Sequence, residues 1–156
     1  MPHWMPLSCF QLTTHTGPYE HWPSKTPLLR DGQPTGTSIQ GYTLLHQLQH
    51  AAGFLLITDF DCPFEEAVCF TLLGPQLEQI SVRVWGAPYA SFWLDELFES
   101  AAGTLCCDLS GLYLELSLRA WHVPYLLPKL QFARLKESAY LQRRDEAVQR
   151  LHERIR

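Results

Sequence analysis

The residues of this chain with the clearest capacity for chemistry are four carboxylates within the string DFDCPFEE, residues 59–66: Asp59, Asp61, Glu65 and Glu66. Carboxylates held at a fixed separation can act as general acid and general base, as in glycoside hydrolysis. A calcium-binding loop needs a central glycine and a terminal glutamate at fixed spacing, and the string lacks this pattern. Three interpretations therefore stay open: a solvated acidic turn, a protein-binding patch, and a metal or catalytic site.

A second acidic group, Asp95, Glu96 and Glu99, follows a stretch that is rich in aromatic residues. Aromatic rings supply anchoring area at a protein interface, and charges supply steering and register. On one extended strand Tyr89 and Trp93 would share a face, so we expect these two rings to be partly exposed. The predicted partner-binding residues are Asp59, Asp61, Glu65, Glu66, Tyr89, Trp93, Asp95, Glu96 and Glu99.

The cysteines and histidines give no comparable signal. Cys62 has acidic neighbours, which disfavour the thiolate that a nucleophile needs. His46 and His50 stand four residues apart, but no third or fourth zinc ligand accompanies them. A glycine-rich phosphate loop and a nucleophile elbow are both missing from the sequence. We therefore expect no catalytic residue, no metal and no cofactor. The cysteines inside apolar runs should behave as small core residues: Cys69, Cys106 and Cys107.

The charges are unevenly distributed along the 156 residues, which carry a net charge of −4. Residues 1–128 contain four basic and twelve acidic groups, whereas residues 129–156 contain eight basic and four acidic groups. An acidic body disfavours nucleic acid, whose phosphates need Lys and Arg, and favours a basic protein partner. The oligomeric state cannot be predicted from these charges.

The length and composition predict a single domain, residues 1–156, because 46% of the residues are hydrophobic and 18% are charged. The five cysteines form no disulfide framework. The first residues lack a basic segment followed by an apolar one, and the apolar runs are too short to span a bilayer. These features predict a cytoplasmic protein that does not interact with a membrane.

The predicted fold is α+β and mostly β. Six of the eleven prolines lie in residues 1–41, which predicts an irregular N-terminal wrap with one edge strand near residues 9–14. In residues 42–119, short apolar or alternating runs are separated by turn signals, which predicts an antiparallel β meander. The expected strands are residues 42–49, 54–60, 67–73, 77–85, 89–94, 103–108 and 112–119. Ser110 and Gly111 suit a two-residue hairpin turn between the last two strands. The leucines of the last strand alternate, so that one face carries Leu112, Leu114, Leu116 and Leu118. A helix is the alternative at residues 42–50 and 92–101.

Residues 129–156 predict a C-terminal α-helix, because Arg, Glu, Gln, Leu and Ala are enriched there and neither Gly nor Pro interrupts them. Leu141, Val148, Leu151 and Ile155 recur at spacings of seven, three and four, which places them on one helical face. The helix either packs on the sheet or protrudes to bind a partner or a second copy.

Two segments of the chain, FLLITDFDCPFEEAVCFTLL at residues 54–73 and GAPYASFWL at residues 86–94, carry a resemblance. Together they resemble the bacterial immunity proteins of polymorphic and contact-dependent toxin systems. The resemblance implies stoichiometric binding to a cognate toxin domain, often a basic nuclease, with acidic side chains occluding its active site.

The leading hypothesis is therefore a non-catalytic, immunity-like binding module that neutralises a cationic toxin domain. The first alternative is a small enzyme or ligand-binding β-fold that uses Asp59, Asp61, Glu65 and Glu66. The second alternative is an accessory subunit that joins a larger assembly through its C-terminal helix.

Overall fold

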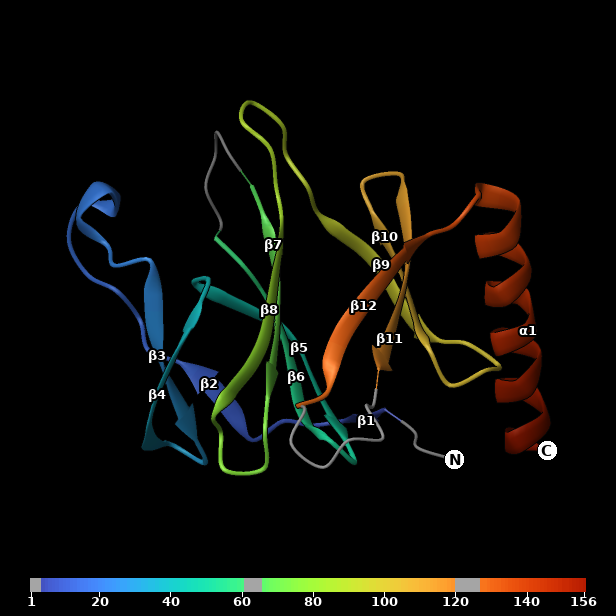
Figure 1. The fold of residues 1–156 in the computed structure, drawn as a ribbon, viewed down its shortest axis with the longest axis horizontal. Coiled ribbons are helices and arrows are strands. Elements are labelled where there is room, and N and C mark those ends of the chain that lie inside the picture. Colours follow the sequence, from blue (N-terminus) through green and yellow to red (C-terminus); the bar gives the residue numbers. More distant parts are fainter. Residues whose placement is uncertain (1–3, 61–65, 120–126) are drawn as a thin grey trace. The chain divides into compact units, whose positions relative to one another are not determined.

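The computed structural model describes residues 4–60, 66–119 and 127–156 (Figure 1). Its contacts divide the chain into two compact units. We call Met5–Phe92 the N-terminal unit, and Trp93–Arg156 together with Trp4 the C-terminal unit. Both are built from antiparallel strands, and the described residues contain one α-helix, at the C-terminal end. The predicted mostly-β fold with one C-terminal helix is confirmed, whereas the single domain stays a prediction.

The N-terminal unit contains a five-stranded and a three-stranded sheet. In the larger sheet, β5 to β8 are consecutive antiparallel neighbours, and the short β1 lies on the outer side of β5. The smaller sheet has the order β2-β3-β4. The strands are β1 Met5–Pro6, β2 Phe10–Leu12, β3 Lys25–Arg30, β4 Gln33–Gln40, β5 Thr43–His50, β6 Gly53–Asp59, β7 Val68–Leu73 and β8 Gln79–Trp85.

The predicted irregular wrap over residues 1–41 is wrong, because these residues contain β1 to β4 and a short 3-10 helix, Tyr19–His21. The one edge strand predicted within it, near residues 9–14, is confirmed as β2. The prolines are accommodated within the strands. Pro27 lies at a register shift of the central β3, and Pro34 lies on β4, which is an edge strand. Edges and bulges are the positions where a strand tolerates a missing N–H donor. The prolines of this segment therefore indicate a bulge and an edge strand, and not the absence of strands.

The core of the N-terminal unit forms where the two sheets bring apolar side chains together. Phe10, Leu28 and Ile39 from the smaller sheet cluster with Phe54 and Leu56 of β6. The run GFLLITD is almost entirely apolar, and all its residues but the last are buried, as expected for an inner strand. The turn before it needs glycine, because Gly53 has a φ of 139° and a Cβ there would collide with the backbone oxygen of Leu73.

The C-terminal unit consists of a four-stranded sheet, in the order β12-β11-β10-β9, and one helix. Ser110 and Gly111 both have positive φ values and form the predicted two-residue turn between β10 and β11. The alternating pattern in β11 is also borne out, since Leu114 and Leu116 are fully buried. The elements are β9 Leu94–Glu99, β10 Leu105–Leu109, β11 Leu112–Arg119, β12 Lys129–Arg134 and α1 Glu137–Ile155.

Three boundaries in the C-terminal part of the chain differ from those predicted. Residues 89–94 do not form a strand, and residues 94–99 form β9 rather than part of a helix. Residues 129–134 form β12, so α1 begins only at Glu137. The segment KLQFAR of β12 is fixed by pairing with β11, which a single-segment pattern cannot reveal. In such short stretches, pairing with a neighbouring strand overrides the intrinsic secondary-structure preference of the residues.

The helix α1 packs on its sheet through Tyr140, which is buried against the rings of Phe98 and Tyr113. The predicted apolar face, Leu141, Val148, Leu151 and Ile155, is exposed instead. Packing on the sheet is therefore observed, but it uses a different face of the helix. In the part of the chain that the structure describes, no helix is both long enough and apolar enough to cross a membrane.

Candidate functional site

The predicted site residues are divided between the two units. Asp59 at the end of β6, Glu66 just before β7 and Tyr89 after β8 belong to the N-terminal unit. Trp93, with the residues of the second acidic group, belongs to the C-terminal unit. Asp61 and Glu65 lie outside the described residues, as does Cys62. The predicted residues therefore fall into two separate sets.

A pocket of the N-terminal unit forms where β6, β7 and β8 approach the loops at their ends. Its lining combines the acidic Glu66 with two aromatic residues, Tyr19 and Phe60, and several apolar ones. One carboxylate oxygen of Glu66, Oε2, is buried and has no hydrogen-bond partner among the described residues. The lining residues are Tyr19, Phe60, Glu66, Ala67, Val84, Gly86, Ala87 and Pro88.

An aromatic cluster holds the two rings of the pocket in place. The ring of Tyr42 makes edge contacts with Tyr19, Trp22 and Phe60, with centroids between 5.2 and 5.7 Å apart. Its hydroxyl donates a hydrogen bond to the carbonyl of Pro23 at 2.9 Å. Edge-to-face pairs of this kind add stability beyond simple area burial. Both aromatic rings of the pocket therefore pack against Tyr42.

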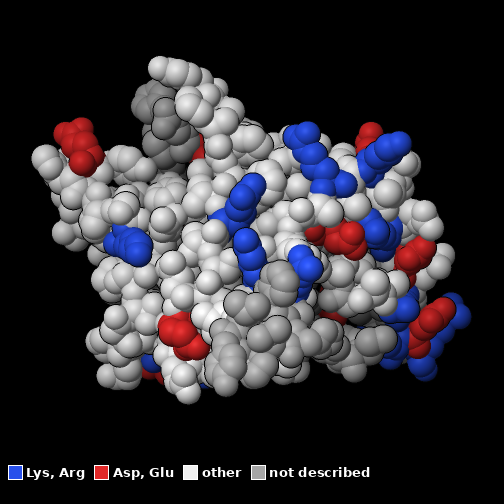
Figure 2. Space-filling model, in the orientation of Figure 1, with Lys and Arg blue, Asp and Glu red and all other residues white. Residues whose placement is uncertain are grey.

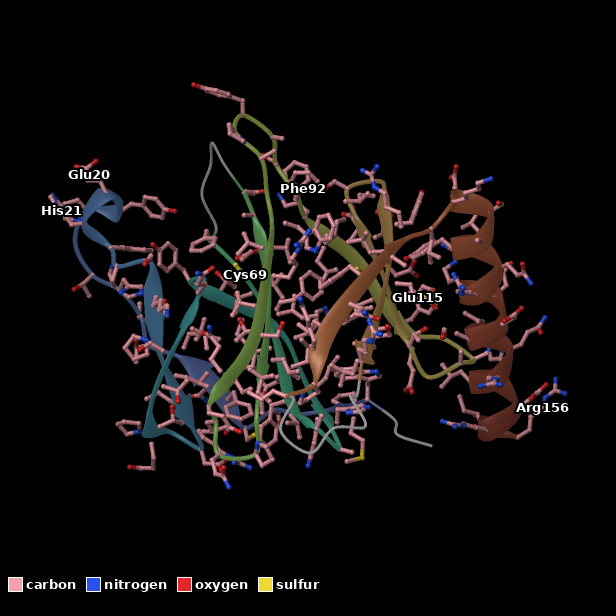
Figure 3. The ribbon with its side chains drawn as sticks, in the orientation of Figure 1. Glu20, His21, Cys69, Phe92, Glu115 and Arg156 are labelled. Carbon is pink, nitrogen blue, oxygen red and sulfur yellow. The ribbon has the colours of Figure 1, made fainter. Side chains whose placement is uncertain are left out.

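Tyr89 lies at the tip of the turn that follows β8, and its side chain is 96% exposed. The turn is closed by the Ala90 N–H, which donates to the carbonyl of Ala87 at 3.2 Å. Tyr89 has a φ of 59°, a left-handed conformation that is unusual for a residue other than glycine. Further along, the Phe92 N–H donates to the carbonyl of Glu66 at 3.1 Å, which ties this loop to the pocket (Figure 3).

Tyr89 and Trp93 do not share a strand face as predicted, because no strand spans residues 89–94 and the two residues fall in different units. Both rings are nevertheless exposed, since Trp93 exposes 54% of its surface. The Trp93 N–H donates to Ser110 Oγ at 2.8 Å, within the C-terminal unit. The expected exposure is thus confirmed for a different structural reason.

The second acidic group lies on β9 and contributes to the internal bonding of the C-terminal unit. The hydroxyl of Tyr140 donates to Glu96 Oε2 at 2.7 Å, and Arg144 lies 3.8 Å from the same oxygen. Burial, with the neighbouring Glu96, raises the pKa of Tyr140. Asp95 Oδ2 accepts a bond from the Ser110 N–H at 3.1 Å. Glu99 instead lines a hollow beneath α1.

A further acidic residue, Glu115 on β11, also binds α1. Its Oε2 lies 3.3 Å from Arg143, and its Oε1 accepts a hydrogen bond from Thr104 at 2.7 Å (Figure 3). The polar face of the sheet is therefore covered by the basic face of the helix. Carboxylates bonded in this way are less available to an outside partner than those at a free surface.

The two units differ clearly in net charge. The N-terminal unit contains three basic and seven acidic residues, whereas the C-terminal unit contains nine of each. The net charge of −4 is therefore carried by the N-terminal unit. On the face drawn in Figure 2, acidic side chains are scattered among basic ones and form no continuous patch. A net charge of this sign steers the approach of a positively charged partner.

The buried thiols of Cys69, Cys106 and Cys107 are poor nucleophiles because their pKa values are raised. Burial raises the pKa of Cys69 and of Cys106 to about 11, and that of Cys107 to about 12. Such thiols stay protonated near neutral pH and act as small hydrophobic residues. Among the described residues, no three His, Cys, Asp or Glu side chains are arranged to hold a metal ion.

Tyr19, Phe60 and Val84 are pocket residues that sequence analysis did not identify as site residues. Tyr19 comes from the proline-rich N-terminal segment. The sequence predicts only that the aromatic residues of this segment pack on the rest of the chain. The position of Tyr19 beside Glu66 depends on how β3 to β6 pair, and no local spacing records that pairing. Asp59, although predicted to act with Glu66, is not among the residues that line the pocket.

Comparison with known proteins adds no relative: no family model, curated protein or solved structure matches this chain.

Proposed function

We propose that the chain is a non-catalytic binding module that takes up a basic protein through its N-terminal unit, in the manner of an immunity protein. The observation that carries the proposal is Glu66, which lines a pocket with two aromatic residues and whose buried Oε2 has no hydrogen-bond partner among the described residues. A buried carboxylate oxygen of this kind is costly until a donor reaches it. A cationic side chain supplies that donor.

The walls of the pocket favour the same class of partner. Cations are attracted to aromatic faces, and the guanidinium group also binds carboxylates through paired N–H groups. Tyr19 and Phe60 provide the rings, and Glu66 provides the carboxylate. An Arg or Lys side chain of the partner therefore fits this pocket better than an apolar or an acidic one.

Two further features support the recognition of a protein. Tyr89 presents a ring that is almost fully exposed on the loop beside the pocket, and aromatic rings are the commonest anchors of protein interfaces. The net charge of −4 on the N-terminal unit would accelerate encounter with a basic partner and would make the association rate sensitive to salt.

The proposal is tested with the protein encoded immediately upstream of this chain, which is the expected cognate partner of an immunity protein. The two purified proteins are mixed, and their stoichiometry is measured by calorimetry and their association rate by stopped-flow fluorescence. We expect a one-to-one complex whose association rate falls at least about tenfold between about 0.05 M and about 0.5 M NaCl. Absence of a complex, or a rate unaffected by salt, would overturn the proposal.

The pocket is tested by Glu66→Gln, which removes the charge but keeps the shape of the side chain. A hydrogen bond to a charged group contributes about 1.5–3 kcal/mol, so we expect affinity to fall about tenfold or more. Glu20→Gln is the matched control, because Glu20 is exposed next to Tyr19 but does not line the pocket. Equal losses in both variants would show that only the overall charge matters, and the pocket would then have no part in binding.

A further inference from the structure

Strand β8 is an edge of the five-stranded sheet, and among the described residues it pairs with β7 alone. An edge strand directs every second N–H and C=O group outward, where another chain can pair with them. The last part of β8 also reaches the pocket that Glu66 lines, because Val84 is one of the lining residues. The outer edge of β8 and the candidate binding pocket therefore meet at Val84.

The other edges of the three sheets carry features that discourage pairing. The edge strands β1 and β2 are only two and three residues long, and β4 contains Pro34, which lacks an N–H. β9 carries three carboxylates, and β12 carries two basic side chains. Short length, proline and charge are the usual protections of an edge strand. The sequence of β8, QISVRVW, has no proline, one charge and three β-branched apolar residues, so it is the edge best suited to accept another strand.

The register of the sheet shows which main-chain groups of β8 face outward. The Gly74 N–H donates to the carbonyl of Glu78 at 2.8 Å, on the side of β7 that faces β8. Successive residues of an inner strand bond to opposite neighbours, so every second residue of β7, counted back from Gly74, bonds toward β8. The partners of these residues on β8 are Ser81, Arg83 and Trp85. The N–H and C=O groups of Val82 and Val84 therefore point away from β7.

The side chains of the same two valines form an apolar row that leads to the pocket. Side chains two residues apart lie on the same face of a strand, so Val82 shares its face with Val84. The side chain of Val84 is 42% exposed. Arg83 belongs to the other face, where its guanidinium carbon lies 5.1 Å from the centre of the Trp85 ring. The row therefore includes no positive charge that would repel a basic segment.

We propose that the basic partner adds an extended segment of its own chain to β8. The segment pairs with the main-chain groups of Val82 and Val84, and its Arg or Lys side chain enters the pocket of Glu66. This inference rests on the proposed function and specifies how the same site holds its partner. Main-chain pairing supplies affinity, and alternate side chains supply specificity. The Glu66 carboxylate and the net charge of −4 on the N-terminal unit favour a basic residue at the pocket, whereas Arg83 disfavours one directly opposite itself.

Amide hydrogen exchange tests this arrangement residue by residue. It is measured by nuclear magnetic resonance on the isotope-labelled full-length chain, alone and mixed with the protein encoded immediately upstream. We expect exchange at Val82 and Val84 to slow at least about tenfold in the complex, because each amide gains an interstrand hydrogen bond. The amides of Ser81 and Arg83 already face β7 and should change much less.

The exchange measurement separates this inference from the proposed function. A complex that forms without slowing exchange at Val82 and Val84, or that slows all the amides of β8 equally, overturns strand addition and leaves the proposed function standing. Absence of a complex overturns both. Slowing of the same two amides in the free chain as its concentration rises would show that a second copy occupies the edge, which also overturns the proposal.

Val82→Pro removes one outward N–H and should lower the affinity for the partner at least about tenfold. Edge strands tolerate proline where the N–H faces solvent, so the pairing of β8 with β7 should persist. Val82→Thr is the matched control, because it keeps the β-branched shape and the N–H, and its affinity should stay within about twofold. Circular dichroism checks both folds. Unchanged affinity in Val82→Pro, or equal losses in the two variants, would contradict the proposal. If Val82→Pro does not fold, the exchange pattern alone decides.

Discussion

The two units of this chain use acidic side chains in different ways. In the C-terminal unit Glu96 and Glu115 lie on the face of the sheet that α1 covers, where Arg144 and Arg143 meet them. In the N-terminal unit acidic residues outnumber basic ones, and Glu66 Oε2 is buried without a hydrogen-bond partner among the described residues. The presence of acidic residues alone thus does not indicate a binding surface. A carboxylate is available to a partner only where the chain's own Arg and Lys side chains do not already pair with it.

The largest expected effects on stability come from substitutions in the core of each unit. Phe10→Ala in the N-terminal unit and Tyr140→Ala in the C-terminal unit should each cost about 3–5 kcal/mol, because both side chains are fully packed aromatics. Denaturant unfolding followed by near-ultraviolet circular dichroism measures the cost. If the units unfold separately, each substitution lowers a different transition, whereas one cooperative domain shows a single transition lowered by both.

Tyr140→Phe is the control for the second substitution. It keeps the ring between Phe98 and Tyr113 but removes the hydrogen bond to Glu96, which is partly exposed. We expect a loss of about 1 kcal/mol. A loss as large as that of Tyr140→Ala would mean that the polar contact, and not the packing of the ring, holds the helix on the sheet.

Alkaline pH should destabilise the C-terminal unit more than the N-terminal unit. Burial raises the pKa of Cys106 to about 11 and that of Cys107 to about 12, and among the described residues of the other unit only the pKa of Cys69 is comparably raised. A raised pKa means that the folded state holds its proton longer, so this stability is present below about pH 9 and is lost as pH rises toward 11. Each thiol should cost on the order of 1 kcal/mol by pH 10.

The alkaline effect is measured as the free energy of unfolding between pH 8 and pH 10, in protein kept reduced. Cys107→Ala is the direct check, since it should remove part of the pH dependence of the C-terminal unit and leave that of the N-terminal unit unchanged. Identical pH profiles with and without this thiol would contradict the assignment.

The ion pair between Arg143 and Glu115 should contribute little. The two groups are 3.3 Å apart, but both side chains are partly exposed, and such pairs contribute at most about 1 kcal/mol. Arg143→Met keeps an unbranched apolar stem and should cost less than about 1 kcal/mol in the same unfolding measurement. A larger cost would show that the polar face of the sheet depends on this contact, and it would strengthen the contrast between the units.

The smallest effect on stability is expected at Tyr89. Its ring is almost fully exposed and its φ of 59° suits glycine, so Tyr89→Gly should change stability by no more than about 1 kcal/mol. The same substitution should weaken binding of the basic partner, because it removes an interface anchor. A large loss of stability, or unchanged affinity, would remove Tyr89 from the proposed interface.

Local patterns predicted much of the fold. The alternation of leucines in β11 and the Ser110–Gly111 turn are properties of a few adjacent residues, and both were predicted correctly. The edge strand β2 was predicted, but β3 and β4 were missed, because Pro27 and Pro34 fit only at a bulge and an edge that tertiary pairing creates. The helix was predicted too early by eight residues, since β12 exists only through its pairing with β11.

The candidate site could be predicted only in part. The string that contains Glu66 stands out in the sequence, and so does the aromatic stretch that contains Tyr89. Tyr19 could not be found, because it is far from Glu66 in sequence and lines the same pocket only through the packing of the N-terminal segment. The role of Glu96 was equally hidden, since it depends on which face of α1 meets the sheet.

Trp4 belongs to the C-terminal unit although it lies near the start of the chain, and this has a consequence for proteolysis. The chain passes from one unit to the other twice, once between Trp4 and Met5 and once between Phe92 and Trp93. Cleavage at the exposed Tyr89 turn would leave a first fragment that still carries Trp4, whose buried indole donates to the carbonyl of Gly103 in the second fragment. A nicked molecule would therefore be expected to migrate as one particle under native conditions and as two bands after denaturation.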